Sequence, residues 1–231
     1  MTVASVTQEL LDVKTIRLKW PDGHNPDFKT GQFITLQWPD TPAYRRAYSL
    51  SSCALDRGHY DVTVKRDGKM GTRLVDWTKH GDKLMVHPPA GRFLPQLEPG
   101  KHLICLAGGS GVTPFLGFAR EATLRRLATR IIVLYSVRTP RDIIFNDHFR
   151  QLEQDNPHFS FYVTCTRLHE EEKWDGRRGR ITPDWVKSHA LDLPNTVFYA
   201  CGPHALVDFA EQIVLKDLKV PKAQMVTEKW G

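Results

Sequence analysis

The sequence predicts an antiparallel β-barrel or sandwich followed by a doubly wound α/β domain. Roughly the first 100 residues alternate polar and apolar side chains between Gly- and Pro-rich clusters, which is typical of short antiparallel strands. The remaining residues carry continuous apolar runs separated by amphipathic stretches, which is typical of a parallel sheet covered by helices. A length of 231 residues suits two small domains.

The alternation in the first half is clearest in residues 31–38 and 59–66. Every second residue there is apolar and is expected to point into the core. These are Ile34, Leu36 and Trp38 in the first segment, and Tyr60, Val62 and Val64 in the second.

In the second half, apolar runs at 103–107, 131–135, 161–163 and 196–200 indicate strands that are buried on both faces. Helical patterns follow the first and the last of them, the last one with an apolar stripe at Leu206, Ala210, Ile213 and Val214. The composition changes near residues 96–102, so we expect domains at 1–98 and 99–231.

Composition excludes several classes of protein. The four cysteines, at 53, 105, 165 and 201, are far apart, which argues against a metal site, an iron–sulfur cluster or a disulfide framework. No run approaches the ~20 apolar residues of a membrane helix, and the first residues lack a signal-peptide pattern, so a cytoplasmic protein is expected. The net charge of +6 fits either a solvated surface or a basic face for an acidic protein partner.

Residues 107–114, Ala-Gly-Gly-Ser-Gly-Val-Thr-Pro, follow a predicted buried strand and open a predicted helix. Glycines let a backbone approach a pyrophosphate closely, and a helix N-terminus favours its negative charge. The alternative is an ordinary tight turn between strand and helix.

Residues 46–52, Arg-Ala-Tyr-Ser-Leu-Ser-Ser, combine groups that suit a flat ligand with a phosphate. Arg46 is a phosphate clamp, Tyr48 a ring face and Ser49 a hydrogen-bonding hydroxyl. Considered alone, the segment equally resembles an edge strand with a polar face.

Two further loops complete the set. Lys69-Met-Gly-Thr enters a short helix, where Gly71 and Thr72 are candidate donors to a pyrophosphate or part of a plain helix cap. Cys201 lies in Tyr-Ala-Cys-Gly-Pro, at the end of the last apolar run, where open α/β sheets bind ligands. It is either a crevice residue or a buried small one.

These four segments, in this order, resemble the ferredoxin–NADP reductase superfamily over nearly the whole chain. The resemblance implies a six-stranded antiparallel FAD-binding barrel followed by a five-stranded parallel NAD(P)-binding domain. Residues 136–145 are similar to stand-alone, oxygenase-type and hybrid-cluster-protein reductases, and residues 88–93 to phenylacetyl-CoA oxygenase reductases. Many of the latter also carry a ferredoxin domain, whose cysteine set is not found here.

For the flavin, the resemblance implies that Arg46 contacts a phosphate, Tyr48 packs on the isoalloxazine ring and Ser49 lies near N5. Further flavin contacts are implied for Ala47, Val64, Lys65, Met70, Gly71 and Thr72. The position of Gly71 and Thr72 favours FAD over FMN.

For the nicotinamide nucleotide, the resemblance implies a cradle of Gly109, Gly111, Thr113 and Pro114. Cys201 is expected beside nicotinamide C4, followed by Gly202 and Pro203. Glu228 and Trp230 match the family's carboxyl-terminal positions near the active site. Ser49, Cys201 and Glu228 are therefore the candidate catalytic residues.

Thr166 and Arg167 resemble the Ser/Thr-Arg pair that meets the 2′-phosphate in NADP-using members, with Arg138 as a candidate helper from the neighbouring strand, which favours NADPH and leaves NADH open. The alternative is that Arg167 is an ordinary solvated loop arginine. The expected activity is hydride transfer from NAD(P)H to flavin, followed by electron transfer to a separate acidic ferredoxin, flavodoxin or oxygenase component. Basic residues near the flavin segments fit such a partner: Arg45, Arg46, Lys65, Arg66, Lys69 and Arg73. The alternatives are a free flavin reductase and a non-catalytic nucleotide-binding subunit.

Overall fold

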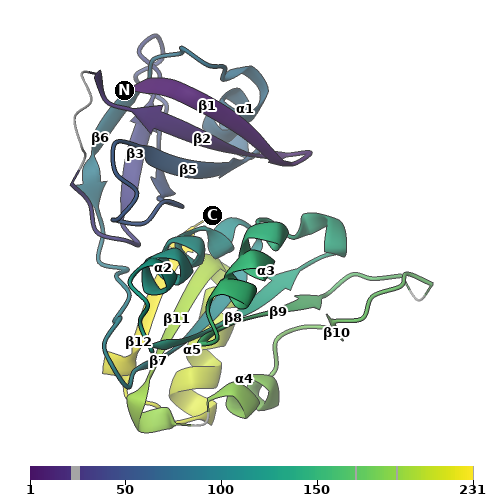
Figure 1. Cartoon of the computed structure of the whole chain (residues 1–231). Coiled ribbons are helices and arrows are strands. Elements are labelled where there is room, and N and C mark those ends of the chain that lie inside the picture. The colour runs from purple at the N-terminus through teal and green to yellow at the C-terminus, as the bar shows by residue number, and fades with distance from the viewer. Residues whose placement is uncertain (22–26, 170, 191, 231) are drawn as a thin grey trace. The chain divides into compact units, whose positions relative to one another are not determined.

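The computed structural model describes residues 1–21, 27–169, 171–190 and 192–230. It divides the chain into two compact units (Figure 1). The barrel unit comprises Met1–Leu94 and Thr113–Glu121, and the sheet unit comprises Pro95–Val112 and Ala122–Gly231.

The barrel unit contains the six antiparallel strands that the sequence predicts. They are β1 (Thr2–Leu10), β2 (Val13–Lys19), β3 (Phe33–Gln37), β4 (Arg45–Ser49), β5 (Tyr60–Lys65) and β6 (Met85–Ala90). They form two three-stranded sheets, ordered β1-β2-β5 and β4-β3-β6. Isolated bridges, Thr2 to Lys83 and Leu50 to Val62, connect the two sheets. Helix α1 (Gly68–Trp77) lies between β5 and β6 in the chain.

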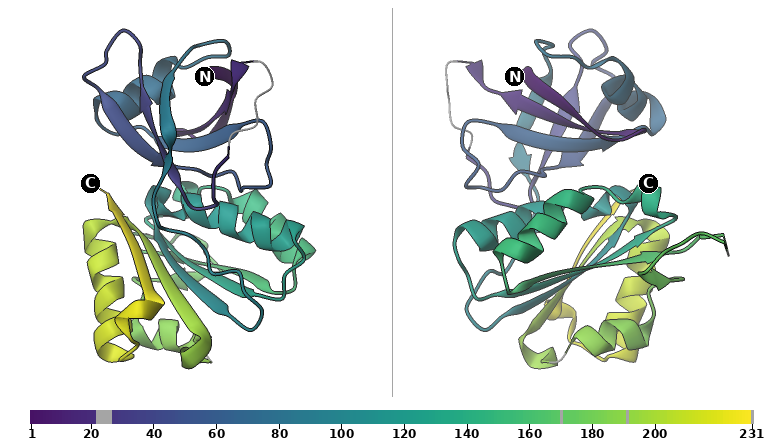
Figure 2. Two further views of the ribbon diagram at one scale, coloured as in Figure 1. Left: turned by 90° about the vertical axis from the view of Figure 1, so that its left-hand side faces the viewer. Right: turned by 45° about the vertical axis from the view of Figure 1, so that its right-hand side comes forward.

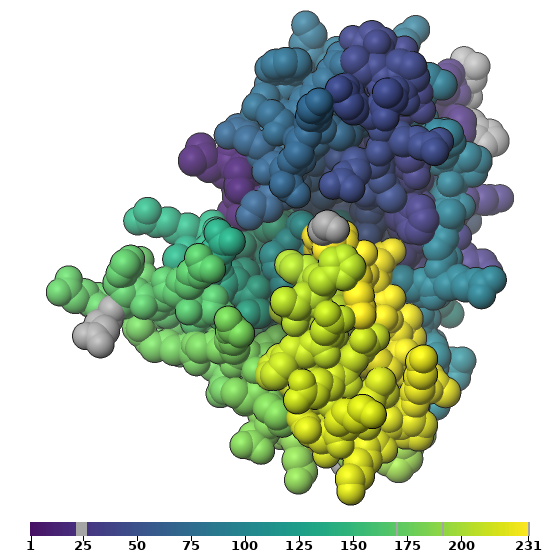
Figure 3. All heavy atoms as spheres, turned by 180° about the vertical axis from the view of Figure 1, so that it is seen from behind, coloured from purple at the N-terminus to yellow at the C-terminus, as the bar shows by residue number. Residues whose placement is uncertain are grey.

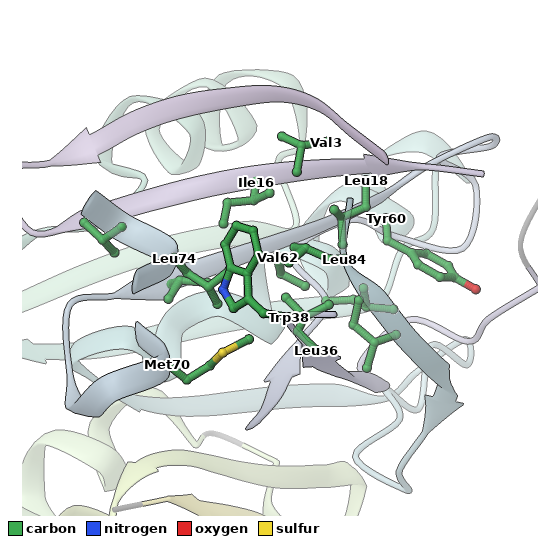
Figure 4. Close-up of a cluster of buried hydrophobic side chains, with 14 residues drawn as sticks. Val3, Ile16, Leu18, Leu36, Trp38, Tyr60, Val62, Met70, Leu74 and Leu84 are labelled. Atoms are coloured by element: carbon green, nitrogen blue, oxygen red, sulfur yellow. The ribbon is translucent and has the colours of Figure 1, made fainter. Parts of the chain in front are cut away.

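The predicted inward-facing residues of β3 and β5 form the core of this unit (Figure 4). Ile34, Leu36, Tyr60, Val62 and Val64 are all essentially inaccessible to solvent. Trp38 lies among the labelled side chains of the cluster, together with Met70 and Leu74 from α1. Helix α1 is therefore fixed to the barrel through its apolar face.

The first part of α2 (Thr113–Leu124) belongs to the barrel unit rather than to the sheet unit. Phe115 and Phe118 pack on Phe93 with ring centroids 5.8 and 5.7 Å apart. Arg120 Nη2 donates to Asp56 Oδ1 over 2.5 Å. Through these contacts, Thr113–Glu121 is part of the barrel unit.

The sheet unit is built on one sheet of six parallel strands, ordered β10-β9-β8-β7-β11-β12. The strands are β7 (His102–Gly108), β8 (Arg130–Val137), β9 (Phe159–Cys165), β10 (Arg177–Arg178), β11 (Thr196–Pro203) and β12 (Met225–Trp230). The expected count of five strands was wrong by one. The additional strand, β10, has only two residues, both arginine, so no apolar run reveals it.

Helices cover both faces of this sheet, which confirms the doubly wound prediction (Figure 2). On one face, α4 (Pro183–His189), α5 (His204–Glu211) and the π-helical segment Gln212–Asp217 pack on alternate residues of β7, β8 and β11. On the other, α3 (Asn146–Asp155) stacks Phe149 on Phe161 of β9, with centroids 4.5 Å apart. The described residues between β9 and β10, 166–169 and 171–176, project from the rest of the unit (Figures 1 and 3).

No helix within the described ranges is long and apolar enough to cross a lipid bilayer.

Candidate functional site

The predicted flavin residues of the barrel unit converge from three elements. Strand β4 carries Arg46, Ala47, Tyr48 and Ser49. The Leu50–Val62 bridge brings the end of β4 to β5, which carries Val64 and Lys65. Helix α1 begins three residues after β5, so its first turn lies beside the end of that strand.

Strand β4 is more exposed than β3, the strand with which it pairs. Arg46 and Ala47 are exposed, whereas Tyr48 and Ser49 are half-buried. The Tyr48 side chain packs against the barrel core, and burial raises the pKa of its hydroxyl well above the ordinary value. A neutral tyrosine ring with one face on the core suits stacking against an apolar ring system.

Two predicted flavin residues point their side chains inward. Val64 and Met70 are both buried in the barrel core. Only their backbones are thus available to a ligand. Lys65 has an exposed side chain, and its Nζ lies 3.4 Å from Asp12 Oδ2.

Gly71 shows a close approach that no other residue type permits. A Cβ at this position would lie 2.7 Å from the carbonyl oxygen of Lys65, which lets the first turn of α1 pack on the end of β5. Only the first N–H groups of a helix are open to a ligand, and in α1 these are the N–H groups of Gly68, Lys69 and Met70. The predicted donors Gly71 and Thr72 lie one and two residues beyond them. With no side-chain cap at Asp67, the first turn of α1 offers its first N–H groups to an anion.

Of the six basic residues predicted to bind an acidic partner protein, three are paired with carboxylates of this chain. Arg66 pairs with Asp76 over 2.6 Å, Arg73 with Asp40 over 2.7 Å, and Lys65 with Asp12. Lys69 donates to the hydroxyl of Tyr44 over 3.1 Å. These acidic partners reduce the net positive charge that the cluster presents.

In the sheet unit, the glycine-rich loop after β7 packs directly on the end of β11. A Cβ on Gly111 would lie 2.1 Å from the carbonyl oxygen of Cys201 and 2.6 Å from Cη2 of Trp230. A Cβ on Gly202 would lie 3.2 Å from the backbone of Gly108. Gly109 has a φ of +53°, in the left-handed region. The loop is thus a backbone cradle at the carboxyl ends of adjacent strands, where such sheets bind nucleotides.

A residue not singled out from the sequence fixes this loop. The hydroxyl of Tyr135, in β8, donates to the carbonyl oxygen of Gly109 over 2.8 Å. Tyr135 is fully buried, so it was indistinguishable in the sequence from the apolar residues around it. Thr113 and Pro114, which open α2 after the loop, are also buried.

Cys201 is fully buried rather than open to solvent. It pairs with Glu228 of β12 in register, and its Sγ lies 3.9 Å from Glu228 Oε2. Burial, followed by the nearby Glu228 carboxylate, raises the pKa of the Cys201 thiol well above its ordinary value. Trp230 and the exposed Pro203 are register partners two residues beyond this pair.

A pocket of about 230 Å³ opens between α5 and the strands β7 and β8. It is lined by Leu106, Ser136, Thr166, Arg180, Ile181, Ala205, Leu206, Phe209, Ala210 and Ile213. Its volume is below the ~300–1,000 Å³ of pockets for whole drug-sized ligands, so it fits a part of a dinucleotide. The apolar walls, two hydroxyls and one guanidinium suit a ring with a polar or charged substituent.

Of the three residues predicted to meet a 2′-phosphate, Thr166 lines this pocket, and Arg138 and Arg167 do not. Thr166 donates to the carbonyl oxygen of Val137 through both its N–H and its hydroxyl. The backbones of Arg167 and Arg138 are joined by a 2.8 Å hydrogen bond, and both side chains are exposed. The arginine at the pocket is Arg180, which the dense Arg-Arg-Gly-Arg run at 177–180 could have suggested.

Comparison with known proteins identifies the two halves. The model of the oxidoreductase FAD-binding domain matches residues 1–94, and that of the oxidoreductase NAD-binding domain matches residues 105–212. The glycine betaine monooxygenase reductase subunit of Chromohalobacter salexigens is 31% identical over 213 residues, covering 90% of this chain and 58% of the relative. The chain thus spans less than two thirds of that relative's length.

Two solved structures show the same fold. Phthalate dioxygenase reductase superimposes with a TM-score of 0.79 and 26% identity, covering all of this chain and 67% of the other. The FAD/NAD-binding domain of a Vibrio cholerae nitric oxide dioxygenase superimposes with a TM-score of 0.87 and 24% identity, covering 100% and 97%. The chain therefore belongs to the ferredoxin–NADP reductase superfamily, with an FAD-binding domain followed by an NAD-binding domain.

Proposed function

We propose that this chain is a reductase that transfers a hydride from NAD(P)H to bound FAD and delivers the electrons to the redox component of an oxygenase. The observation that carries the proposal is the glycine cradle beside Cys201. The glycine-rich loop follows β7, packs Gly111 on the Cys201 backbone and opens α2, which is the strand–loop–helix arrangement whose free N–H groups bind a pyrophosphate in dinucleotide-binding sheets.

On the flavin side, Arg46 and the first turn of α1 bind the phosphates. The half-buried Tyr48 ring packs on the flavin, and the Ser49 hydroxyl offers a hydrogen bond at the reacting edge of the ring. FAD, when bound, accepts two electrons as a hydride and releases them one at a time. The chain's own groups set its position and its electrostatic surroundings.

On the nucleotide side, the backbone of the loop at Gly109 and Gly111 receives the pyrophosphate. The Cys201 thiol is buried and its pKa is raised, so it is not a nucleophile, and it is the Cys201 backbone beside Gly111 that borders the nicotinamide site. Glu228 and Trp230, joined to Cys201 and Pro203 by strand register, close the same region. Orientation of the reacting ring is the main contribution of these residues.

The pocket at Thr166 and Arg180 takes the adenosine end of the nucleotide. Arg180 supplies the positive charge at the pocket, and Arg138 and Arg167 provide two more exposed guanidinium groups on the neighbouring loops. Several arginines at this end favour NADPH over NADH, because a 2′-phosphate gains charge-assisted hydrogen bonds that a ribose hydroxyl does not.

The proposed acceptor is an acidic redox protein of oxygenase type. The glycine betaine monooxygenase reductase subunit is a component of such a system by its name. The charge of this chain is +6, and Arg45 at the start of β4 is exposed. If charge guides docking, cytochrome c reduction through an acidic ferredoxin falls steeply as ionic strength rises.

The decisive experiment is an anaerobic titration of the purified holoprotein with NADH and with NADPH, followed at the flavin absorption band. Stoichiometric bleaching by at least one nucleotide supports the proposal. Absence of bleaching with both would overturn it and leave a nucleotide-binding protein without reductase activity. Bleaching with flavin that is lost on gel filtration would instead favour a free flavin reductase.

A further inference from the structure

The two segments proposed to bind the FAD phosphates are separate in the chain. Arg46 is in β4, and the anion-binding turn is at the start of α1, with the whole of β5 between them in the chain. The loop between β3 and β4, residues 38–44, leads into Arg45 and lies against α1 through side-chain contacts. These contacts determine where the two segments stand relative to each other.

Arg73, in the middle of α1, makes the main contact. Its Nη1 donates to Asp40 Oδ1 over 2.9 Å, and its Nη2 donates to Asp40 Oδ2 over 2.7 Å. Nη1 also donates to Thr41 Oγ1 over 2.8 Å. The guanidinium lies 4.3 Å above the ring of Trp38, so Arg73 holds three residues of the loop at once.

The charges of this pair act on each other. The hydrogen bond from Arg73 is the main cause that holds the pKa of Asp40 below its ordinary value. The Arg73 side chain is 23% exposed, whereas that of Asp40 is 64% exposed. The bidentate geometry and the stacking on Trp38 give the contact a fixed direction, which a lone exposed ion pair lacks.

Lys69 adds a second contact one helical turn earlier. Its Nζ lies 3.1 Å from the Tyr44 hydroxyl and 5.0 Å from the centre of the Tyr44 ring. Residues four apart lie on one face of a helix, so Lys69 and Arg73 fasten the same face of α1 to the two ends of the loop. Tyr44 is the residue immediately before β4.

A different ion pair at α1 does not reach this loop. Arg66, just before the helix, pairs with Asp76 within it over 2.6 Å. This pair has a length similar to that of Arg73 and Asp40, but it joins the helix only to its own leading residues. It is therefore a matched control.

We propose that Arg73 is a positioning residue for FAD, which holds the first turn of α1 in register with Arg46 so that both meet the phosphates of one FAD molecule. The inference rests on the proposed placement of the phosphates at Arg46 and α1. A ligand held by two elements binds more tightly when those elements are already in place. FMN has only the flavin-side phosphate, so its binding depends on Arg46 and little on α1.

The test compares FAD and FMN affinities of the full-length protein, measured by flavin fluorescence on reconstitution of the apoprotein. For Arg73→Ala we expect FAD affinity to fall about 10- to 100-fold, the range for lost hydrogen bonds to a charged group. We expect FMN affinity to fall less than about 3-fold. Arg66→Ala should change neither affinity by more than this. Thermal unfolding of each apoprotein, followed by circular dichroism, measures any general loss of stability.

Asp40→Asn provides a second variant if Arg73→Ala does not fold, because Asp40 is largely exposed and its loss should give the same FAD-selective defect. Equal losses of FAD and FMN affinity, or a loss no larger than that of Arg66→Ala, would overturn the role of Arg73. Arg46→Ala tests the underlying placement separately, since it should weaken both flavins. If Arg46→Ala weakens neither, the proposed phosphate site itself fails.

Discussion

Cys201 of β11 and Glu228 of β12 are register partners in adjacent parallel strands, with Sγ 3.9 Å from Oε2. The thiol is fully buried, and burial together with the carboxylate raises its pKa. A thiol that is both buried and protonated reacts slowly, because the thiolate is the nucleophile.

We therefore predict that native Cys201 reacts slowly with thiol-specific reagents at neutral pH. The other three cysteines are buried too, so a chromogenic disulfide reagent should titrate less than about one thiol within minutes in the native protein. All four cysteines should react after unfolding in guanidinium. Cys201→Ser identifies the site: rapid labelling of the native protein that disappears in this variant would contradict the prediction.

Gly111→Ala should damage nucleotide binding by a steric effect. The new Cβ would lie 2.1 Å from the Cys201 carbonyl oxygen, so the loop or β11 must move. Forcing atoms into a packed site costs about 1–3 kcal/mol, and moving the cradle should also weaken NAD(P)H binding. Chemical denaturation and nucleotide titration measure the two effects.

Gly100→Ala is the control for the Gly111 variant. Gly100 has a φ of +77° and nothing within 4 Å of an added Cβ, so only backbone strain of about 1–2 kcal/mol is expected, with nucleotide affinity unchanged. Equal nucleotide affinities for the two variants would show that the loop at Gly111 is not the cradle.

The barrel was predictable because its strands have one buried and one polar face. Ile34 and Leu36 are buried as the alternation requires. What the sequence does not reveal is the fastening of α1 by Arg73, because Asp40 lies 33 positions earlier and both residues read as ordinary surface charges. Long-range ion pairs leave no periodic signal.

Four strands of the sheet unit, β7, β8, β9 and β11, were predictable for the opposite reason, since they are largely buried and their apolar runs are continuous. The two-residue strand β10 escaped prediction because Arg177 and Arg178 join the sheet by backbone pairing alone. Arg180 escaped as well, because the Arg-Arg-Gly-Arg run at 177–180 signals a basic segment without showing which of its arginines lines the pocket.

The Arg17–Asp61 pair should make the stability of the protein fall in acid. Arg17 donates to both carboxylate oxygens of Asp61 over 2.8 and 2.7 Å. Burial alone would raise the pKa of Asp61, but the hydrogen bonds from Arg17 and His59 outweigh it, and the pKa lies below the ordinary value of 3.8. A depressed pKa stabilises the folded state above the unfolded pKa, and this stabilisation is lost as the pH falls through the folded pKa.

Asp61→Asn should therefore lower the free energy of unfolding by about 1–3 kcal/mol at neutral pH, as expected for hydrogen bonds to a charged group. The difference from the wild type should shrink once the pH is below 3.8. Urea unfolding at a series of pH values measures it. A difference that stays constant between neutral and acidic pH would show that the charge of Asp61 is not the cause.

The last prediction concerns the choice of nucleotide, which depends on where a 2′-phosphate meets positive charge. Arg180 lines the pocket together with Thr166, whereas Arg167 and Arg138 are exposed on the adjoining loops. Loss of one charge-assisted hydrogen bond costs about 1.5–3 kcal/mol, so Arg180→Gln should raise the KM for NADPH about 10- to 100-fold. The KM for NADH should change less than about 3-fold, because its ribose carries no charge there.

Two further variants serve as comparisons. Arg167→Gln should give a smaller NADPH-selective effect. Arg178→Gln should give none, because the Arg178 guanidinium instead bonds the Glu172 carbonyl oxygen. Steady-state kinetics with both nucleotides distinguish these outcomes: equal effects of Arg180→Gln on NADH and NADPH would exclude a 2′-phosphate contact, and a larger effect of Arg167→Gln would move that contact to the loop after β9.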